Sequence, residues 1–209
     1  MNLSLNEMEA TAKRATRGGL YSWGLAEDAA KATRWLCARG LDGGAVLAAL
    51  LQQEFAASLH DHTPQSLDGP WRCETTLCPL IAGVTLSDCA GRLVQGPIEM
   101  RQLAQPLLIL PFAAQVARRL ERPVTVTSGS WAAVTDGTAL SMPQEAPDHA
   151  EHLRIELGGA LLQLRPHHTR ATPAPETHAL LSRFAHLTYA PATEESRLLG
   201  AGAGLSDND

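Results

Sequence analysis

The spacing of apolar residues in this chain changes at a polar connection, residues 60–72, and that change constrains the fold most. Before the connection, apolar residues recur every three to four positions, which is typical of amphipathic helices. After it, several stretches alternate apolar and polar residues, which is typical of half-buried strands. We therefore expect an α+β fold, with a helical segment over residues 1–59 and an α+β segment over residues 73–209 within one compact domain.

Three helices are predicted in the N-terminal segment, and each has its own start signal. Ser4 begins a capping-box pattern at the start of the first helix. Ser22 is predicted to cap a second helix that ends at Gly40, and Asp42 is predicted to cap a third. The third helix is apolar on all sides over residues 45–51, which indicates a buried, central position.

The second segment is predicted to form a mixed, largely antiparallel sheet. Its apolar patterns predict strands over residues 78–86, 107–110, 124–126, 131–135, 138–142, 153–157 and 160–165. A helix between the second and third of these strands would form one parallel βαβ crossover. Asp136 and Gly137 predict a hairpin turn, and further helices are expected to open at Pro175 and Thr193, before a glycine-rich tail.

Charge and hydropathy exclude several classes of function. Seventeen basic and twenty-two acidic residues give a net charge of -5, which disfavours binding to a phosphate backbone, so no nucleic-acid partner is expected. The most apolar run, residues 106–114, is far shorter than the roughly 20 residues that cross a bilayer. The N-terminus lacks the basic and then apolar pattern of a signal peptide. We therefore expect a cytoplasmic protein with no membrane contact and with reduced cysteines.

The C-terminal tail carries the most unusual candidate binding pattern. Its glycines alternate with alanines, a spacing that lets backbone amides approach an anion without obstruction by side chains. An arginine one turn earlier adds donors, and two aspartates near the end can accept hydrogen bonds. The predicted ligand-binding residues of the tail are Arg197, Gly200, Gly202, Gly204, Asp207 and Asp209. Chain ends rich in small residues usually fray, so an inert C-terminus is the competing interpretation.

The turn between the first two helices is a second candidate site. Ser22 and Trp23 lie between two glycines and are predicted to close over a ligand. Helix capping by Ser22 and core packing by Trp23 would explain the same residues without a ligand. The chain has no G-x-S-x-G or S-x-x-K motif, which disfavours a serine hydrolase.

A zinc site is a third candidate. The residues that suggest it are His60, His62, Cys73, Cys78, Cys89, His149 and His152. The cysteine spacing is looser than that of usual structural zinc sites, and cysteine is commonly a small buried apolar residue. Zinc binding is therefore retained only as an alternative.

Three stretches of the chain resemble an uncharacterised proteobacterial family of unknown function. They are SLNEMEATAKRATRG, WGLAEDAAKATRWLCARGLDG and, at the C-terminus, TYAPATEESRLLGAGAGLSDND. The family has no assigned reaction, so the resemblance assigns no catalytic residue and no cofactor. It does imply that the glycine-rich tail belongs to the protein, which strengthens the expectation of an ordered tail with a function.

Two classes of function follow from these observations. In the first, a small-molecule enzyme or binding protein holds an anionic metabolite with its tail, Arg197 and the Ser22–Trp23 turn. In the second, the chain is a non-catalytic accessory or oligomerising subunit whose tail docks on a partner protein, since alanine-rich helices permit close approach. The sequence leaves the reaction and the substrate open.

Overall fold

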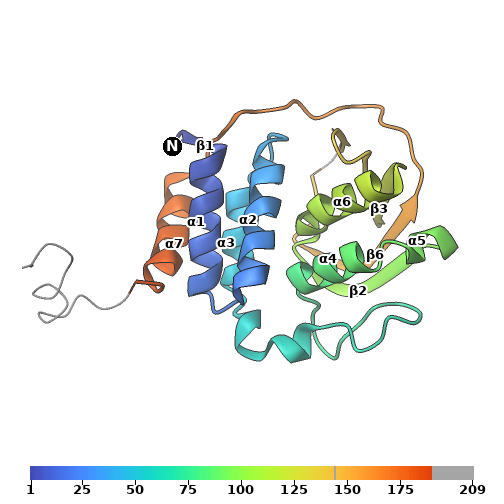
Figure 1. The fold of residues 1–209 in the computed structure, drawn as a ribbon, viewed down its shortest axis with the longest axis horizontal. Helices are drawn as coiled ribbons and strands as arrows, with labels where there is room; N and C mark the ends of the chain where they lie inside the picture. The colour runs from blue at the N-terminus through green and yellow to red at the C-terminus, as the bar shows by residue number, and fades with distance from the viewer. Residues whose placement is uncertain (144, 190–209) are drawn as a thin grey trace, which may run out of the picture.

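The chain folds into a layer of helices beside a second layer that contains a β-sheet, which confirms the predicted α+β class (Figure 1). The computed structural model describes residues 1–143 and 145–189. A long segment without helix or extended strand pairing crosses from the sheet back to the helical layer along the top of Figure 1. We call this segment, residues 158–174, the strap.

The helical layer contains the three predicted N-terminal helices and one helix from near the C-terminus. The cap at Ser4 forms a full capping box with Glu7, and Ser22 and Asp42 cap their helices as predicted. The last helix packs against the first, so both ends of the described chain meet in one layer. These helices are α1 (Leu5–Gly18), α2 (Trp23–Cys37), α3 (Gly43–Leu51) and α7 (Pro175–His186).

A two-stranded ribbon fastens the strap to the start of the helical layer. It pairs β1 (Leu3–Ser4) with β7 (Arg170–Ala171) in antiparallel register. The Arg170 guanidinium also donates to the side chain and the carbonyl oxygen of Asn2. The strap is therefore held beside the first residues of α1.

The larger sheet has five strands in the order β2-β6-β3-β4-β5, and every pairing within it is antiparallel. Helix α6 packs on β3 and β4, and helix α4 packs on α6. The strands are β2 (Ile98–Ala104), β3 (Val124–Ser128), β4 (Trp131–Thr135), β5 (Leu140–Ser141) and β6 (His149–Leu157). The remaining helices are α4 (Pro79–Asp88), α5 (Arg92–Gln95) and α6 (Leu110–Leu120), with 3-10 turns η1 (Phe55–His62) and η2 (Pro106–Ile109).

The predicted crossover is present in a different form. Strands β2 and β3 both pair antiparallel with β6, so they run in the same direction and α6 connects them. The prediction was wrong about the first strand, because residues 107–110 form the η2 turn and the start of α6. It was also wrong about adjacency, because β6 lies between the two parallel strands.

Two other predicted strands are wrong. Residues 78–86 lie at the start of α4 and within it, where Pro79 occupies an early helical position suited to its fixed φ. A short apolar run is compatible with the repeat of a helix and with that of a strand, so the alternation of apolar and polar residues alone could not exclude a helix. Residues 160–165 form no strand: after the turn at Gly158 and Gly159, at φ of 107° and 105°, the segment makes a single antiparallel bridge, from Leu164 to Ser141 of β5.

The hairpin at Asp136 and Gly137 and the strand over residues 153–157 are confirmed. One apolar core runs through both layers, from Met8 in α1 to Ile155 in β6. The boundary predicted at residues 60–72 stays a prediction. Within the described ranges, no helix has the length and apolar character needed to cross a membrane.

Candidate functional site

A pocket of about 510 Å³ lies where the start of α1, the second half of α2 and the strap meet. We call it the α2 pocket. Helix α2 contributes Lys31, Arg34 and Trp35, and the turn that follows it contributes Ala38 and Arg39. The residue before α1 and its first turn contribute Ser4, Leu5 and Asn6, and the strap contributes His167 and Thr169. Residues three and four apart share one face of a helix, which is why these α2 side chains gather on one wall.

Positive charge dominates the wall of the α2 pocket. Lys31, Arg34 and Arg39 line it, together with His167, and no aspartate or glutamate does. Arg34 is the best compensated of the three cations, because its Nη1 lies 3.0 Å from Glu9 Oε2 and also donates to Asn6. Within residues 1–143 and 145–189, Lys31 and Arg39 form no ion pair with a carboxylate.

The Arg39 side chain is fixed in the pocket wall by neutral partners. Its Cζ lies 4.2 Å from the centre of the Trp35 ring, and its Nη1 donates to the Trp35 carbonyl oxygen at 3.3 Å. Its Nη2 donates to the Thr138 carbonyl oxygen in the turn between β4 and β5. Arg39 therefore connects the helical layer with the sheet.

The Arg39 charge lies in an unfavourable environment. Burial lowers the pKa of the guanidinium, the positive charge of Arg118 lowers it further, and the Asp136 carboxylate offsets part of this effect. An arginine stays charged even so, because its pKa in water lies far above neutral pH. The result is a half-buried cation without a close counter-charge in the described part of the chain.

Two N–H groups in the same wall have no acceptor among the described residues. They are the indole Nε1 of Trp35 and the Nε of Arg39, and both atoms are buried from solvent. A buried donor without a partner costs about 1–3 kcal/mol, so such groups are rare and each requires an explanation. The wall of the α2 pocket thus carries two cations that have no ion-pair partner among the described residues, and two N–H groups that solvent does not reach.

The strap is bound to the end of α2 by hydrogen bonds to exposed carbonyl groups. Arg165 donates through Nη2 to the Gly40 carbonyl oxygen at 2.9 Å and through Nε to that of Arg39 at 3.3 Å. The backbone N–H of His168 donates to the Ala38 carbonyl oxygen at 2.8 Å. The last carbonyls of a helix have no partner within the helix, so these bonds satisfy them and hold the strap beside the pocket.

The predicted turn residues Ser22 and Trp23 lie at the opposite end of α2 and do not line the α2 pocket. Ser22 Oγ accepts a hydrogen bond from the Leu25 N–H at 3.3 Å. The Trp23 side chain is 63% exposed, with the Arg17 guanidinium 4.7 Å from its ring centre. Ser22 therefore caps the helix, Trp23 is not a core residue, and a ligand contact at either stays a prediction.

Replacing Ser22 with alanine is expected to destabilise the fold without changing ligand affinity. Loss of an N-cap costs about 1 kcal/mol, which lowers the melting temperature of a chain this long by roughly 2–4 °C. Ser22→Asp keeps a capping oxygen and serves as the control in thermal denaturation. Equal melting temperatures for all three chains would contradict the capping role.

The residues predicted in the tail, Arg197, Gly200, Gly202, Gly204, Asp207 and Asp209, lie outside the described residues.

The histidines and cysteines of the zinc hypothesis have other contacts in the structure. His62 Nδ1 lies 2.8 Å from the Thr76 carbonyl oxygen, and Cys78 Sγ lies 3.6 Å from the Tyr21 hydroxyl oxygen. All four cysteines are free thiols. Among residues 1–143 and 145–189, no three histidine, cysteine, aspartate or glutamate side chains are grouped so that they could hold a metal ion.

The four thiols are expected to differ in reactivity. Burial raises the pKa of both Cys37 and Cys78, which lowers the thiolate fraction that reacts, whereas Cys73 and Cys89 are only half-buried. A thiol reagent at pH 8 should therefore label Cys73 and Cys89 in the folded protein, and the other two only after unfolding. Peptide mass spectrometry measures this, and rapid labelling of Cys37 or Cys78 in the folded chain would contradict their burial.

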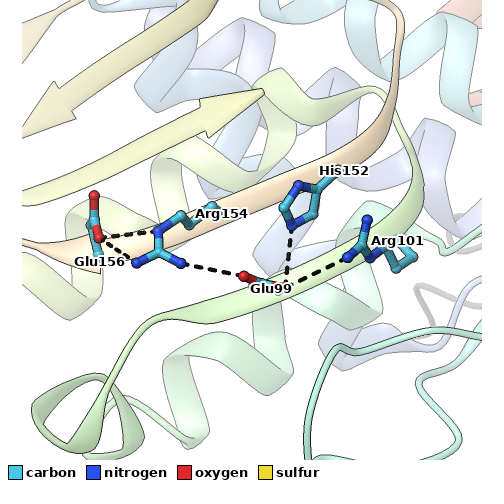
Figure 2. Close-up of polar contacts among 5 residues, drawn as sticks. All are labelled: Glu99, Arg101, His152, Arg154 and Glu156. Carbon is cyan, nitrogen blue, oxygen red and sulfur yellow. Dashed lines mark hydrogen bonds and ion pairs between the residues drawn. The ribbon is translucent and has the colours of Figure 1, made fainter. Parts of the chain in front are cut away.

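A second group of charges lies across β2 and β6, and it compensates itself (Figure 2). Glu99 is at its centre, with its carboxylate oxygens 3.2 Å from Arg154 Nη1 and 3.3 Å from His152 Nε2. Arg101 lies 3.7 Å from the same carboxylate, and Arg154 also contacts Glu156 at 3.0 Å. Because every arginine here has a carboxylate partner, this cluster lacks the free positive charge of the α2 pocket.

Sequence comparison finds a match over residues 3–90, a range that includes every residue lining the α2 pocket except His167 and Thr169. No curated protein matches the chain. The match includes the first two of the three stretches that suggested an uncharacterised family, and the C-terminal stretch lies outside it. Over residues 3–90 this chain is similar to the proteins of unknown function grouped as DUF3726, which confirms the resemblance for that part of the chain.

Proposed function

We propose that the chain binds a small organic anion, a carboxylate or a phosphate ester, in the α2 pocket. The observation that carries this proposal is the environment of Arg39. Its guanidinium is half-buried beside Arg118 and has no ion-pair partner among the described residues. An anionic ligand in the pocket would bring a counter-charge to this guanidinium.

The neighbouring side chains fit the same class of ligand. The Trp35 side chain gives the wall an apolar, aromatic surface. Lys31 adds a further cation one turn before Trp35 on the same helix face. A volume of about 510 Å³ lies within the range of known small-molecule sites. The proposal concerns binding and names no reaction. The positive charge of the pocket wall supports a negatively charged ligand.

Thermal-shift measurements with matched pairs of ligands test the proposal. The probes are carboxylates and phosphate esters, each compared with its neutral amide or alcohol. Anionic probes should raise the melting temperature in a concentration-dependent way, because a ligand that binds only the folded state stabilises it. Added salt should weaken the effect. Equal shifts from the neutral analogues, or no shift from any anion, would overturn the proposal.

A chain that ends at Leu199 distinguishes the α2 pocket from the tail as the anion site. The shortened chain removes the predicted tail glycines and aspartates but keeps every residue of the pocket wall. It should therefore respond to anions as the full chain does. If the response disappears, the anion site belongs to the tail, and the placement in the α2 pocket is wrong.

A role as an interacting subunit is the second candidate function. Leu20 is 71% exposed although its φ of 71° is costly for a residue with a side chain, and Trp23 beside it is also exposed. If Leu20 lies in an interface between copies of the chain, light scattering of the unsubstituted chain should give a mass above that of the monomer. Leu20→Lys should then lower this mass toward that of the monomer. A monomeric mass for the unsubstituted chain would count against self-association.

A further inference from the structure

Four large apolar side chains are exposed where α1 and α7 end and α2 begins. Leu20 follows α1 and Trp23 opens α2, and they are 71% and 63% exposed. Leu187 and Tyr189 follow α7, and they are 70% and 55% exposed. We call these four residues the end patch. Large apolar side chains that gather on a surface mark an interaction site more often than singly scattered ones do.

The last turns of α1 connect the two parts of the end patch. Arg14 Nη1 donates to the Tyr189 hydroxyl oxygen at 2.9 Å, and Arg17 Cζ lies 4.7 Å from the centre of the Trp23 ring. Arg14 and Arg17 are three residues apart, so they share one face of α1. Helices α1 and α7 lie side by side (Figure 1). The exposed side chains and the two arginines therefore form one continuous surface.

This surface carries positive charge that the described chain does not neutralise. Arg14 and Arg17 donate only to uncharged oxygens within residues 1–143 and 145–189, and neither forms an ion pair there. The neighbouring Lys13 differs, because its Nζ lies 2.7 Å from Glu27 Oε1. A segment that fits the end patch should therefore combine carboxylates with apolar side chains.

The sequence that follows Tyr189 has this composition. Residues 190–209 lie outside the described ranges, and they include four acidic residues and one basic residue. The acidic residues are Glu194, Glu195, Asp207 and Asp209. Leucines at positions 198, 199 and 205 add apolar side chains. The segment is thus complementary to the end patch in charge and in apolar character.

The first two acidic residues are close enough in sequence for a contact within one molecule. Glu194 follows Tyr189 by five residues, and an extended chain of that length reaches at most about 18 Å. Tyr189 already contacts Arg14, and Arg17 lies only about 4.5 Å further along the axis of α1. The short connection also gives the glutamates a high effective concentration at the end patch.

We propose that residues 190–209 bind the end patch of their own molecule. Glu194 and Glu195 supply counter-charges to the two arginines, and the leucines cover exposed apolar surface. An anionic lipid surface is a less suitable occupant, because the net charge of -5 opposes the approach of the chain to it. The contact is separate from the α2 pocket, since no residue of the end patch lines that pocket.

The ¹⁵N indole signal of Trp23 in the full chain tests this proposal. Removing two charges with Glu194→Gln and Glu195→Gln should shift this signal, although both substitutions are far from Trp23 in sequence. Added salt should reduce the difference between the two chains. The matched control is Asp207→Asn with Asp209→Asn, which removes the same charge further from Tyr189 and should shift the signal less.

A second pair of substitutions shows whether the arginines carry the contact. In a chain with Arg14→Gln and Arg17→Gln, the two glutamate substitutions should no longer move the Trp23 signal. The signal of Trp71, which is 1% exposed, should stay in place in every chain and reports that the fold is intact.

Protein concentration distinguishes the occupants of the end patch. A contact within one molecule gives the same Trp23 shift in dilute and in concentrated solution. A shift that grows with concentration, together with a mass above that of the monomer in light scattering, would assign the end patch to a second copy and overturn the proposal. A Trp23 signal that the glutamate substitutions leave unmoved, or move equally with and without the arginines, would also overturn it.

Discussion

Arg39→Met is expected to weaken anion binding about 10- to 100-fold, because it removes charged hydrogen bonds that are worth roughly 1.5–3 kcal/mol. Methionine keeps an unbranched apolar stem that can still cover the Trp35 ring. The variant also loses the hydrogen bonds to the Trp35 and Thr138 carbonyl oxygens, so its stability without ligand should change by no more than about 1 kcal/mol in either direction. It removes a cation that burial and the neighbouring Arg118 both disfavour.

The combination of a large loss of affinity and a small change in stability distinguishes a ligand-binding residue from a structural one. Isothermal titration calorimetry measures the affinity, and thermal denaturation measures the stability. Arg119→Met is the matched control, since it makes the same change of charge on α6, away from the wall of the α2 pocket. If both variants bind anions as the unsubstituted chain does, Arg39 has no part in binding.

Gly18→Ala is expected to have the largest effect on stability. A Cβ at Gly18 would lie 1.7 Å from the carbonyl oxygen of Phe184, so α1 and α7 would have to move apart. Forcing extra atoms into close packing costs about 1–3 kcal/mol and occasionally more. For a chain of this length, a cost of about 2–3 kcal/mol lowers the melting temperature by roughly 4–12 °C.

Gly24→Ala is the matched control for this packing prediction. Gly24 lies within α2, and a Cβ there would meet no atom within 4 Å. Alanine favours a helix by about 0.8–1 kcal/mol over glycine, so the control should melt at the same or a higher temperature. Equal melting of the two variants would show that α1 and α7 do not pack as closely as the structure places them.

Local signals in the sequence predicted the parts of the fold that local chemistry determines. The cap at Ser4, the cap at Asp42 and the hairpin at Gly137 depend on residues a few positions apart, and all three are confirmed. The α4 helix was missed because a short apolar run is compatible with two periods. Its tight packing depends on Phe112, which lies against Gly83 from a distant part of the sequence.

The candidate site was missed for a similar reason. The sequence does place Lys31, Trp35 and Arg39 four residues apart on one helix face, which was a usable signal for a basic stripe. A basic stripe on a polar face usually faces solvent, and nothing local indicates that it lines a pocket. The wall is completed by the strap, through contacts such as that of Arg165 with the Arg39 carbonyl oxygen, 126 positions apart. The tail residues predicted from the sequence remain predictions.

The indole N–H resonance of Trp35 offers the most direct test of anion binding in the α2 pocket. The chain contains four tryptophans, so four indole signals can be assigned by single phenylalanine substitutions. Titration with an anion that raises the melting temperature should shift the Trp35 signal saturably and leave the Trp71 signal in place, because Trp35 lines the α2 pocket and Trp71 does not. Saturable binding of that anion with an unmoved Trp35 signal would contradict the account.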